Sequence, residues 1–154
     1  VYCAAGDLNG SKGDHFDTHG NNFNRLKNNM LPPLDQAAYT LIADLKSRGM
    51  LDETLVVLLT EFGRTPKINR NNGRAHFPRC FSALVAGGGV KGGTVIGSSS
   101  ADGQEVRNRP VLVGELYSTL LSMLRINPVK ENKLAIGRAI KMADSDEPVT
   151  EMFI

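Results

Sequence analysis

Apolar residues recur at helical spacing in two stretches of the chain. The first stretch follows Pro32 and Pro33, which suit a first helical turn and mark a boundary. Its apolar positions are Leu34, Ala37, Ala38, Leu41, Ile42 and Leu45. This stripe predicts an amphipathic helix that ends at Gly49, because cations and then a glycine close the pattern. The second stretch predicts another helix over Val113–Leu124.

A continuous apolar run, Thr54–Thr60, stands between these helices. It is too short for a helix and partly β-branched, so it suits a central strand of a parallel sheet, buried on both faces. A helix, a short turn and a buried strand make half of a βαβ unit. Glu61 follows this strand directly, and ligand sites of open α/β sheets gather at the carboxyl ends of strands.

Another apolar run, Phe81–Ala86, predicts a second strand, and the glycine-rich Gly87–Gly93 predicts a turn after it. We expect Thr94–Gly97 to pair back as a hairpin. A phosphate-binding loop is the alternative for these glycines, but the GK[ST] ending and the helix that such a loop needs are missing. The tail ends at Met152–Ile154 and is expected to be a loop or short strand that covers the domain.

The first 29 residues are polar and rich in glycine and asparagine, which predicts a loop with a short strand at Val1–Ala5. The chain starts at Val1, and its chemistry-bearing residues begin within the first 20 positions. We therefore expect a single-domain fragment, residues 1–154, whose N-terminal half is missing. Cys3 and Cys80 form no disulfide or metal-ligand pattern, so cysteine usage does not indicate a compartment.

Composition excludes several classes of protein. The chain has 154 residues, of which 41% are hydrophobic, enough for a core. Its formal net charge of +2 gives no reason to expect nucleic-acid binding. No apolar run approaches the length of a membrane-spanning helix.

The histidines lie in two polar clusters, residues 13–20 and 72–78. Asp17 and His19 are two positions apart, so in an extended segment their side chains point the same way. Carboxylate and imidazole are ligands of divalent cations such as zinc, and a hydrogen-bonded loop is the other interpretation. His76 lies in the second cluster, and His15 is expected to be exposed to solvent.

Three charged residues leave alternatives open. Glu61 is a metal ligand, a general base or the ion-pair partner of Arg64. Arg64 and Arg74 are either anion-binding groups or surface charges, since a guanidinium meets phosphate or sulfate with two parallel hydrogen bonds.

Three motifs occur in order along the chain: DTHG, EFGRTP and GRAHFP. Together they resemble the domain-of-unknown-function family 1501 (DUF1501), whose usual wording is WDTHG, EFGRTP and GRDHWP. The resemblance covers nearly the whole chain, including its C-terminal section. It implies the alkaline-phosphatase/sulfatase-like superfamily, with an α/β fold in which a partly parallel sheet is flanked by helices. This chain would be the C-terminal portion of that domain.

The resemblance also assigns roles to individual residues. The metal ligands would be Asp17, His19 and His76, the catalytic residues Glu61 and Arg64, and the anion-binding residues Arg64 and Arg74. The chain departs from the family pattern by having Ala75 for the aspartate, and Phe16 and Phe77 for two tryptophans. Ala75 removes a carboxylate that would bind the metal or orient a histidine. Phe62 stands where catalytic relatives have a second metal ligand.

The expected function is a metal-dependent hydrolase of sulfate or phosphate esters, of which this chain holds the C-terminal half of the site. The cofactor would be a zinc, manganese or calcium ion, and the substrate a small-molecule or glycan ester. The alternative is a non-catalytic, exported binding or scaffold protein with a degraded alkaline-phosphatase-like fold. The resemblance further implies an exported, periplasmic or cell-surface location.

Overall fold

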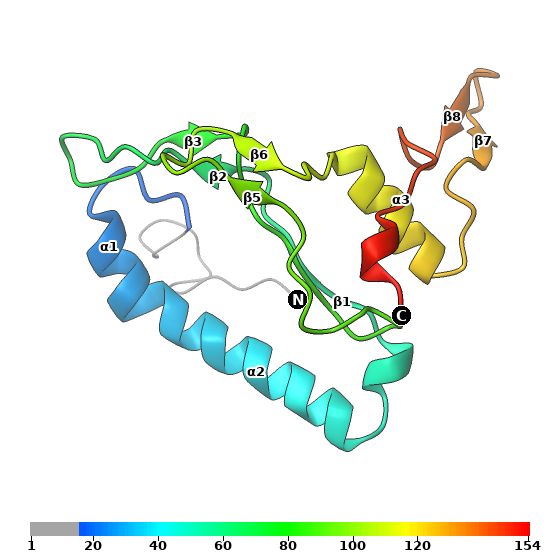
Figure 1. Cartoon of the computed structure of the whole chain (residues 1–154), viewed down its shortest axis with the longest axis horizontal. Helices are drawn as coiled ribbons and strands as arrows, with labels where there is room; N and C mark the ends of the chain where they lie inside the picture. Colours follow the sequence, from blue (N-terminus) through cyan, green and yellow to red (C-terminus); the bar gives the residue numbers. More distant parts are fainter. Residues whose placement is uncertain (1–15) are drawn as a thin grey trace.

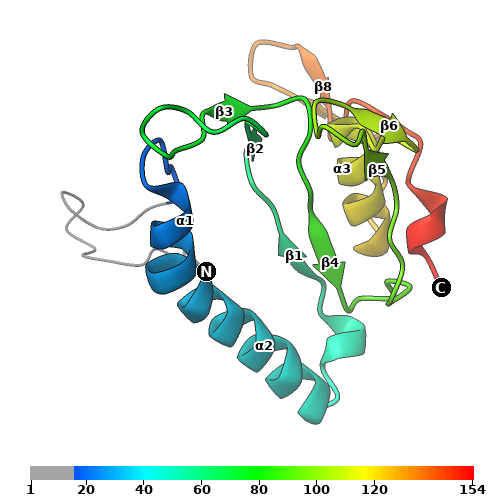
Figure 2. The ribbon, with the colours of Figure 1, turned by 60° about the vertical axis from the view of Figure 1, so that its left-hand side comes forward.

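The computed structural model describes residues 16–154 (Figure 1). The strand predicted at Val1–Ala5, together with Cys3 and His15, lies outside the described residues. Within them the fold is mixed α/β, with one long helix and several small antiparallel sheets. The β1–β4 pair of strands lies between helices α2 and α3 in both views of the ribbon (Figures 1 and 2).

The long helix begins earlier than the sequence predicts. Helix α1 (Asn22–Arg25), the π-helical turn η1 (Leu26–Met30) and helix α2 (Leu31–Ser47) follow one another without a break. The prediction that the chain is a loop up to residue 29 is therefore wrong from Asn22 onward.

The helix accommodates two prolines by widening locally. Pro32 and Pro33 lack an N–H group, so neither can donate to the carbonyl four residues back. The helix widens immediately before them, where the Leu31 N–H donates to the Leu26 carbonyl five residues away. The residues on both sides of the prolines thus belong to one continuous helix.

The end of α2 is as predicted. Gly49 has a φ of 69°. Its N–H donates to the Lys46 carbonyl, and the Met50 N–H donates to the Leu45 carbonyl at 2.8 Å. This is the Schellman pattern, which satisfies the last helical carbonyls.

The apolar run after α2 forms a strand, but its pairing differs from the expected one. Strand β1 (Val56–Leu58) pairs with β4 (Leu84–Ala86) in antiparallel orientation. Leu58 is 36% exposed and Leu59 is 40% exposed. Strand β1 is therefore not buried on both faces, and no parallel pair of strands is present among the described residues, so the structure does not show the expected parallel sheet.

Two more small sheets follow. Strand β2 (Gly63–Arg64) pairs with β3 (His76–Phe77), and β5 (Ser98–Ser99) pairs with β6 (Val106–Asn108). The hairpin expected at Thr94–Gly97 is wrong, since those residues form no strand and β4 pairs with β1 instead. A local glycine-rich turn indicated the hairpin, whereas the true partner of β4 lies far away in the sequence.

The C-terminal part contains helix α3 (Val113–Met123), which confirms the predicted helix, and a short 3-10 turn, η3 (Thr150–Met152). A hairpin of β7 (Glu131–Lys133) and β8 (Ala139–Lys141), not predicted from the sequence, lies at one end of the molecule (Figure 1). The chain end lies against the glycine-rich turn, because Phe153 forms an antiparallel β-bridge with Val90.

The core of this part of the chain is small. Among the described residues, the buried apolar ones are Met30, Ala143 and Val149. Many large apolar side chains of these residues remain in contact with solvent, such as Tyr39 on α2, which is 74% exposed. None of the helices in residues 16–154 has the length and apolarity required to cross a membrane.

We expect two glycines of the turn after β4 to respond differently to substitution. Both Gly87 and Gly89 have positive φ, 71° and 85°. A Cβ at Gly87 would lie 2.3 Å from the Thr54 carbonyl oxygen, whereas one at Gly89 meets nothing within 4 Å. Gly89→Ala should destabilise by about 1–2 kcal/mol through its backbone conformation alone. Gly87→Ala should cost clearly more. Urea unfolding measures both, and equal losses would contradict the contact at Gly87.

Candidate metal centre

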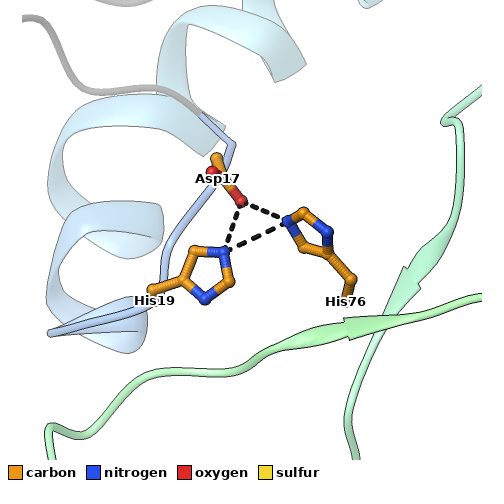
Figure 3. Close-up of side chains that lie close together, drawn as sticks. All are labelled: Asp17, His19 and His76. Carbon is orange, nitrogen blue, oxygen red and sulfur yellow. Dashed lines mark hydrogen bonds and ion pairs between the residues drawn. The ribbon is translucent and has the colours of Figure 1, made fainter.

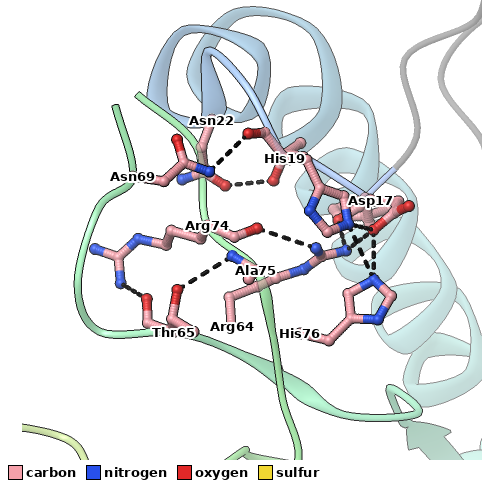
Figure 4. Close-up of polar contacts among 11 residues, drawn as sticks. Asp17, His19, Asn22, Arg64, Thr65, Asn69, Arg74, Ala75 and His76 are labelled. Atoms are coloured by element: carbon pink, nitrogen blue, oxygen red, sulfur yellow. Dashed lines mark hydrogen bonds and ion pairs between the residues drawn. The ribbon is translucent and has the colours of Figure 1, made fainter. Parts of the chain in front are cut away.

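Two segments far apart in the sequence meet through their backbones. Residues 16–22, just before and at the start of α1, lie against the loop of residues 69–75 (Figure 4). Three N–H groups donate across this contact: Asn21 to the Asn71 carbonyl at 2.9 Å, Asn22 to that of Asn72 at 2.8 Å, and Arg74 to that of Thr18 at 3.1 Å. The contact carries the first histidine cluster to the second.

Gly73 allows the two segments to approach closely. It is buried, and a Cβ on it would lie 1.9 Å from the His19 carbonyl oxygen. No side chain fits at that separation, so steric exclusion explains why the GRAHFP motif has a glycine at this position. It fixes the main chain of His19.

The three predicted metal ligands come together at this contact (Figure 3). Asp17 Oδ1 lies 2.9 Å from His19 Nε2 and 2.9 Å from His76 Nε2. The two Nε2 atoms are 3.1 Å apart. Asp17 and His19 come from the segment before α1, and His76 begins β3. The three side chains are 48–58% exposed, so the triangle of atoms opens to solvent.

Hydrogen bonds alone satisfy this triangle poorly. In a neutral imidazole, Nε2 is either a donor or an acceptor. If both histidines donate to Asp17, two N–H groups face each other across 3.1 Å. If one histidine donates to the other, the accepting nitrogen turns its lone pair toward the carboxylate. A cation removes the conflict, because all three atoms then present lone pairs to it.

The distances in the triangle match those between ligands of one cation. Donor atoms bound to zinc at 2.0–2.1 Å are roughly 2.9–3.4 Å apart in octahedral to tetrahedral arrangements. The observed separations of 2.9, 2.9 and 3.1 Å lie in that range. Two imidazoles and one carboxylate suit a transition-metal ion with open positions. They suit calcium poorly, because calcium takes oxygen ligands.

Arg64 supports the carboxylate from the strand beside His76. It is paired with His76 across β2 and β3, and one of its nitrogens lies 2.6 Å from Asp17 Oδ1. The guanidinium also donates to the carbonyls of Phe16 at 2.8 Å and Arg74 at 3.2 Å. Hydrogen bonds from Arg64, then from His76, and the nearby charge of His19 hold the pKa of the Asp17 carboxyl well below its usual range. Asp17 is therefore an ionised carboxylate at neutral pH.

The other predicted site residues lie around the triangle without joining it. Arg64 forms its ion pair with Asp17, so the alternative of a Glu61–Arg64 pair is not what the structure shows. Glu61 is exposed in the bend before β2 and is not part of the three-residue cluster found in the described chain. Its catalytic role stays a prediction, as does anion binding by either arginine.

Arg74 is held by the protein in this structure. It donates to the Thr65 carbonyl at 2.9 Å, and its guanidinium lies 5.3 Å from the centre of the Phe23 ring. The Ala75 N–H donates to Thr65 Oγ1 at 3.1 Å, which keeps the strand leading to His76 in place. Arg74 thus closes the loop that carries the second cluster.

Sequence reasoning missed two neighbours of the histidines. Phe62 lies against His76, with ring centroids 4.1 Å apart and planes tilted by 31°. The sequence indicated only that Phe62 is not a metal ligand. Asn69 donates to the His19 carbonyl at 2.9 Å. The run of asparagines before Gly73 was a signal for a tight turn at this position.

Comparison with known proteins gives one family. The family model described as "Protein of unknown function (DUF1501)" matches residues 6–153. No curated protein and no solved structure gives a significant match to the chain.

We expect Arg64→Gln to raise the pKa of the Asp17 carboxyl toward its usual value, because the largest stabilising contact of the ionised form is removed. A depressed folded-state pKa stabilises the fold above about pH 4. That stabilisation is lost as the pH falls toward the folded-state pKa, so the loss on acidification should be smaller in the variant. Carbon-13 NMR of the carboxyl group measures the titration.

Arg48→Gln is the matched control, because Arg48 pairs with Asp44 on the surface of α2. It should leave the titration of Asp17 unchanged. An unaltered Asp17 pKa in Arg64→Gln would contradict the assigned cause.

Proposed function

Because the chain belongs to the DUF1501 family of proteins of unknown function, we propose a function from its side chains. Asp17, His19 and His76 bind one divalent transition-metal ion, and the protein hydrolyses sulfate or phosphate esters with it. The observation that carries this proposal is the triangle of ligand atoms with 2.9–3.1 Å edges. Two of its corners are imidazole nitrogens, which favours zinc over calcium.

The charges around the site support an anionic substrate. Asp17 and Arg64 neutralise each other across 2.6 Å, and neutral histidines add no charge. A bound divalent ion therefore leaves an excess of two positive charges at an exposed position. Sulfate and phosphate esters carry the complementary charge. When bound, the ion supplies Lewis-acid stabilisation of charge that develops on the ester oxygens.

The chain's own residues prepare the site in this proposal. Arg64 keeps Asp17 ionised and fixes its orientation, as a partner in the outer shell of a metal site does. Phe62 packs against the ring of His76 and limits its rotation. Glu61 is the residue of the family motif that we propose as general base, from its place in the bend after β1.

The finer fold assignment and the location are also proposals. We propose that β1 belongs to an alkaline-phosphatase-like sheet with parallel strands. The support is the order of helix, turn and strand, and the exposed Leu58 and Leu59 in a run typical of a fully buried strand. Export to the periplasm or cell surface rests on the family resemblance alone.

A binding or scaffold protein is the second candidate. Ala75 in place of the family's aspartate favours it, because a carboxylate is missing one residue before His76. Such a protein would hold a metal ion or an anion at the same exposed site without turnover. Metal binding and catalysis must therefore be measured separately.

Metal binding is expected from the purified protein, with one zinc or manganese ion per chain by calorimetry and elemental analysis. Asp17→Asn and His76→Ala should each weaken binding by more than ~100-fold, beyond the effect typical of an outer-shell partner. Glu61→Gln is the control of matched chemistry, and its affinity should equal that of the wild type. A wild-type protein that binds neither metal would overturn the proposal.

In the full-length protein, hydrolysis of 4-nitrophenyl sulfate or 4-nitrophenyl phosphate should depend on the added metal. The His76→Ala variant should show no hydrolysis at metal concentrations that are too low for it to bind the ion. Glu61→Gln should bind metal normally and lose most of its turnover, by roughly 10²–10⁴-fold if Glu61 transfers a proton. Stoichiometric metal without any hydrolysis would refute the hydrolase and support the binding protein.

A further inference from the structure

Asn69 begins the loop of residues 69–75, which faces His19 (Figure 4). Its side-chain Oδ1 accepts from the N–H groups of Asn71 at 2.8 Å and Gly73 at 2.9 Å. Its side-chain Nδ2 donates to the His19 carbonyl at 2.9 Å. One amide therefore closes its own loop and binds the other segment at the same time.

The backbone of this loop is closed around Asn69 as well. The Asn69 N–H donates to the Gly73 carbonyl at 2.9 Å, and the Asn72 N–H donates to the Asn69 carbonyl at 3.1 Å. Asn72 has a φ of 54°, a conformation that asparagine tolerates better than most residues. The loop is thus built as a rigid support for the Asn69 side chain.

His19 is held at its main chain from this side. Asn69 binds its carbonyl oxygen, and the Gly73 backbone is packed so closely that a Cβ would lie 1.9 Å from the same oxygen. Its imidazole extends to Asp17, where Nε2 is 2.9 Å from Oδ1. The main-chain anchor therefore sets the direction from which the ring reaches the triangle.

We propose that Asn69 is a positioning residue of the metal centre, holding the His19 carbonyl so that the imidazole reaches the ion. The inference rests on the proposed metal site and adds a residue that touches no ligand atom. It requires an amide in particular: the nitrogen donates to His19 while the oxygen accepts from the loop. A carboxylate can accept the hydrogen bonds of the loop, but it cannot donate one to His19.

Asn69→Asp separates the two roles. The aspartate keeps an oxygen for the N–H groups of Asn71 and Gly73, but it loses the donor to His19 and sets a negative charge against that carbonyl. We expect cobalt(II), used as the probe, to bind 10–100-fold more weakly, the range typical of outer-shell partners. The visible absorption of the bound cobalt should also change, because the imidazole approaches from an altered direction.

Asn108→Asp is the matched control. Asn108 also donates one side-chain hydrogen bond, to Ser98 Oγ at 3.0 Å, but it does so between β5 and β6. Its cobalt affinity and spectrum should be those of the wild type. Equal affinity and an unchanged spectrum in Asn69→Asp would overturn the inference and leave Asn69 as a loop residue only.

Failure of the metal site itself gives a different result. If the wild type binds no cobalt, the proposed function fails, and the positioning role is then decided by NMR of the histidine rings in metal-free protein. The His19 ring signals should shift in Asn69→Asp and stay in place in Asn108→Asp, and unshifted signals would overturn the role. If Asn69→Asp does not fold by circular dichroism, Asn69→Ala, which places no charge against the His19 carbonyl, takes its place in both measurements.

Discussion

The backbone contact between residues 16–22 and residues 69–75 is the constraint on which the site depends. Asp17 and His19 precede helix α1, and His76 stands 57 residues after His19, at the start of strand β3. Hydrogen bonds between main-chain groups bring them together, and such bonds do not depend on the side chains that do the chemistry. Gly73 lets the segments approach because it offers no Cβ. The ligand triangle is a product of this contact rather than of any regular element.

Electrostatics then sets the chemical character of the site. Three groups converge on one oxygen of Asp17, two of them imidazoles and one a guanidinium. The guanidinium keeps the carboxylate ionised, and the imidazoles supply nitrogen ligands without adding charge when neutral. The same arrangement that opposes a simple hydrogen-bond network is suited to a small cation. Because the three side chains are 48–58% exposed, one side of the triangle faces solvent.

Much of the fold and of the candidate site could be predicted from the sequence. What could be predicted is local, and what could not depends on distant contacts. Helices α2 and α3 follow from local spacing, whereas the set of Asp17, His19 and His76 follows from the family resemblance, and the structure brings these three residues together. The partner of β1, the hairpin at β7 and the roles of Arg64 and Asn69 depend on contacts between distant segments. A single sequence does not contain the geometry of such contacts. Pro32 and Pro33 indicated a boundary that the helix does not have, because a π-helical turn accommodates the N–H groups that they lack.

The small core of residues 16–154 has a consequence for the thermodynamics of unfolding. The slope of stability with denaturant and the heat capacity of unfolding both scale with the surface that unfolding newly exposes. Residues that bury few apolar side chains when folded have less surface left to expose than a compact protein of the same length. The unfolding transition of this chain should be broad in urea and its stability curve flat with temperature. Small changes in free energy will then move its midpoints a long way.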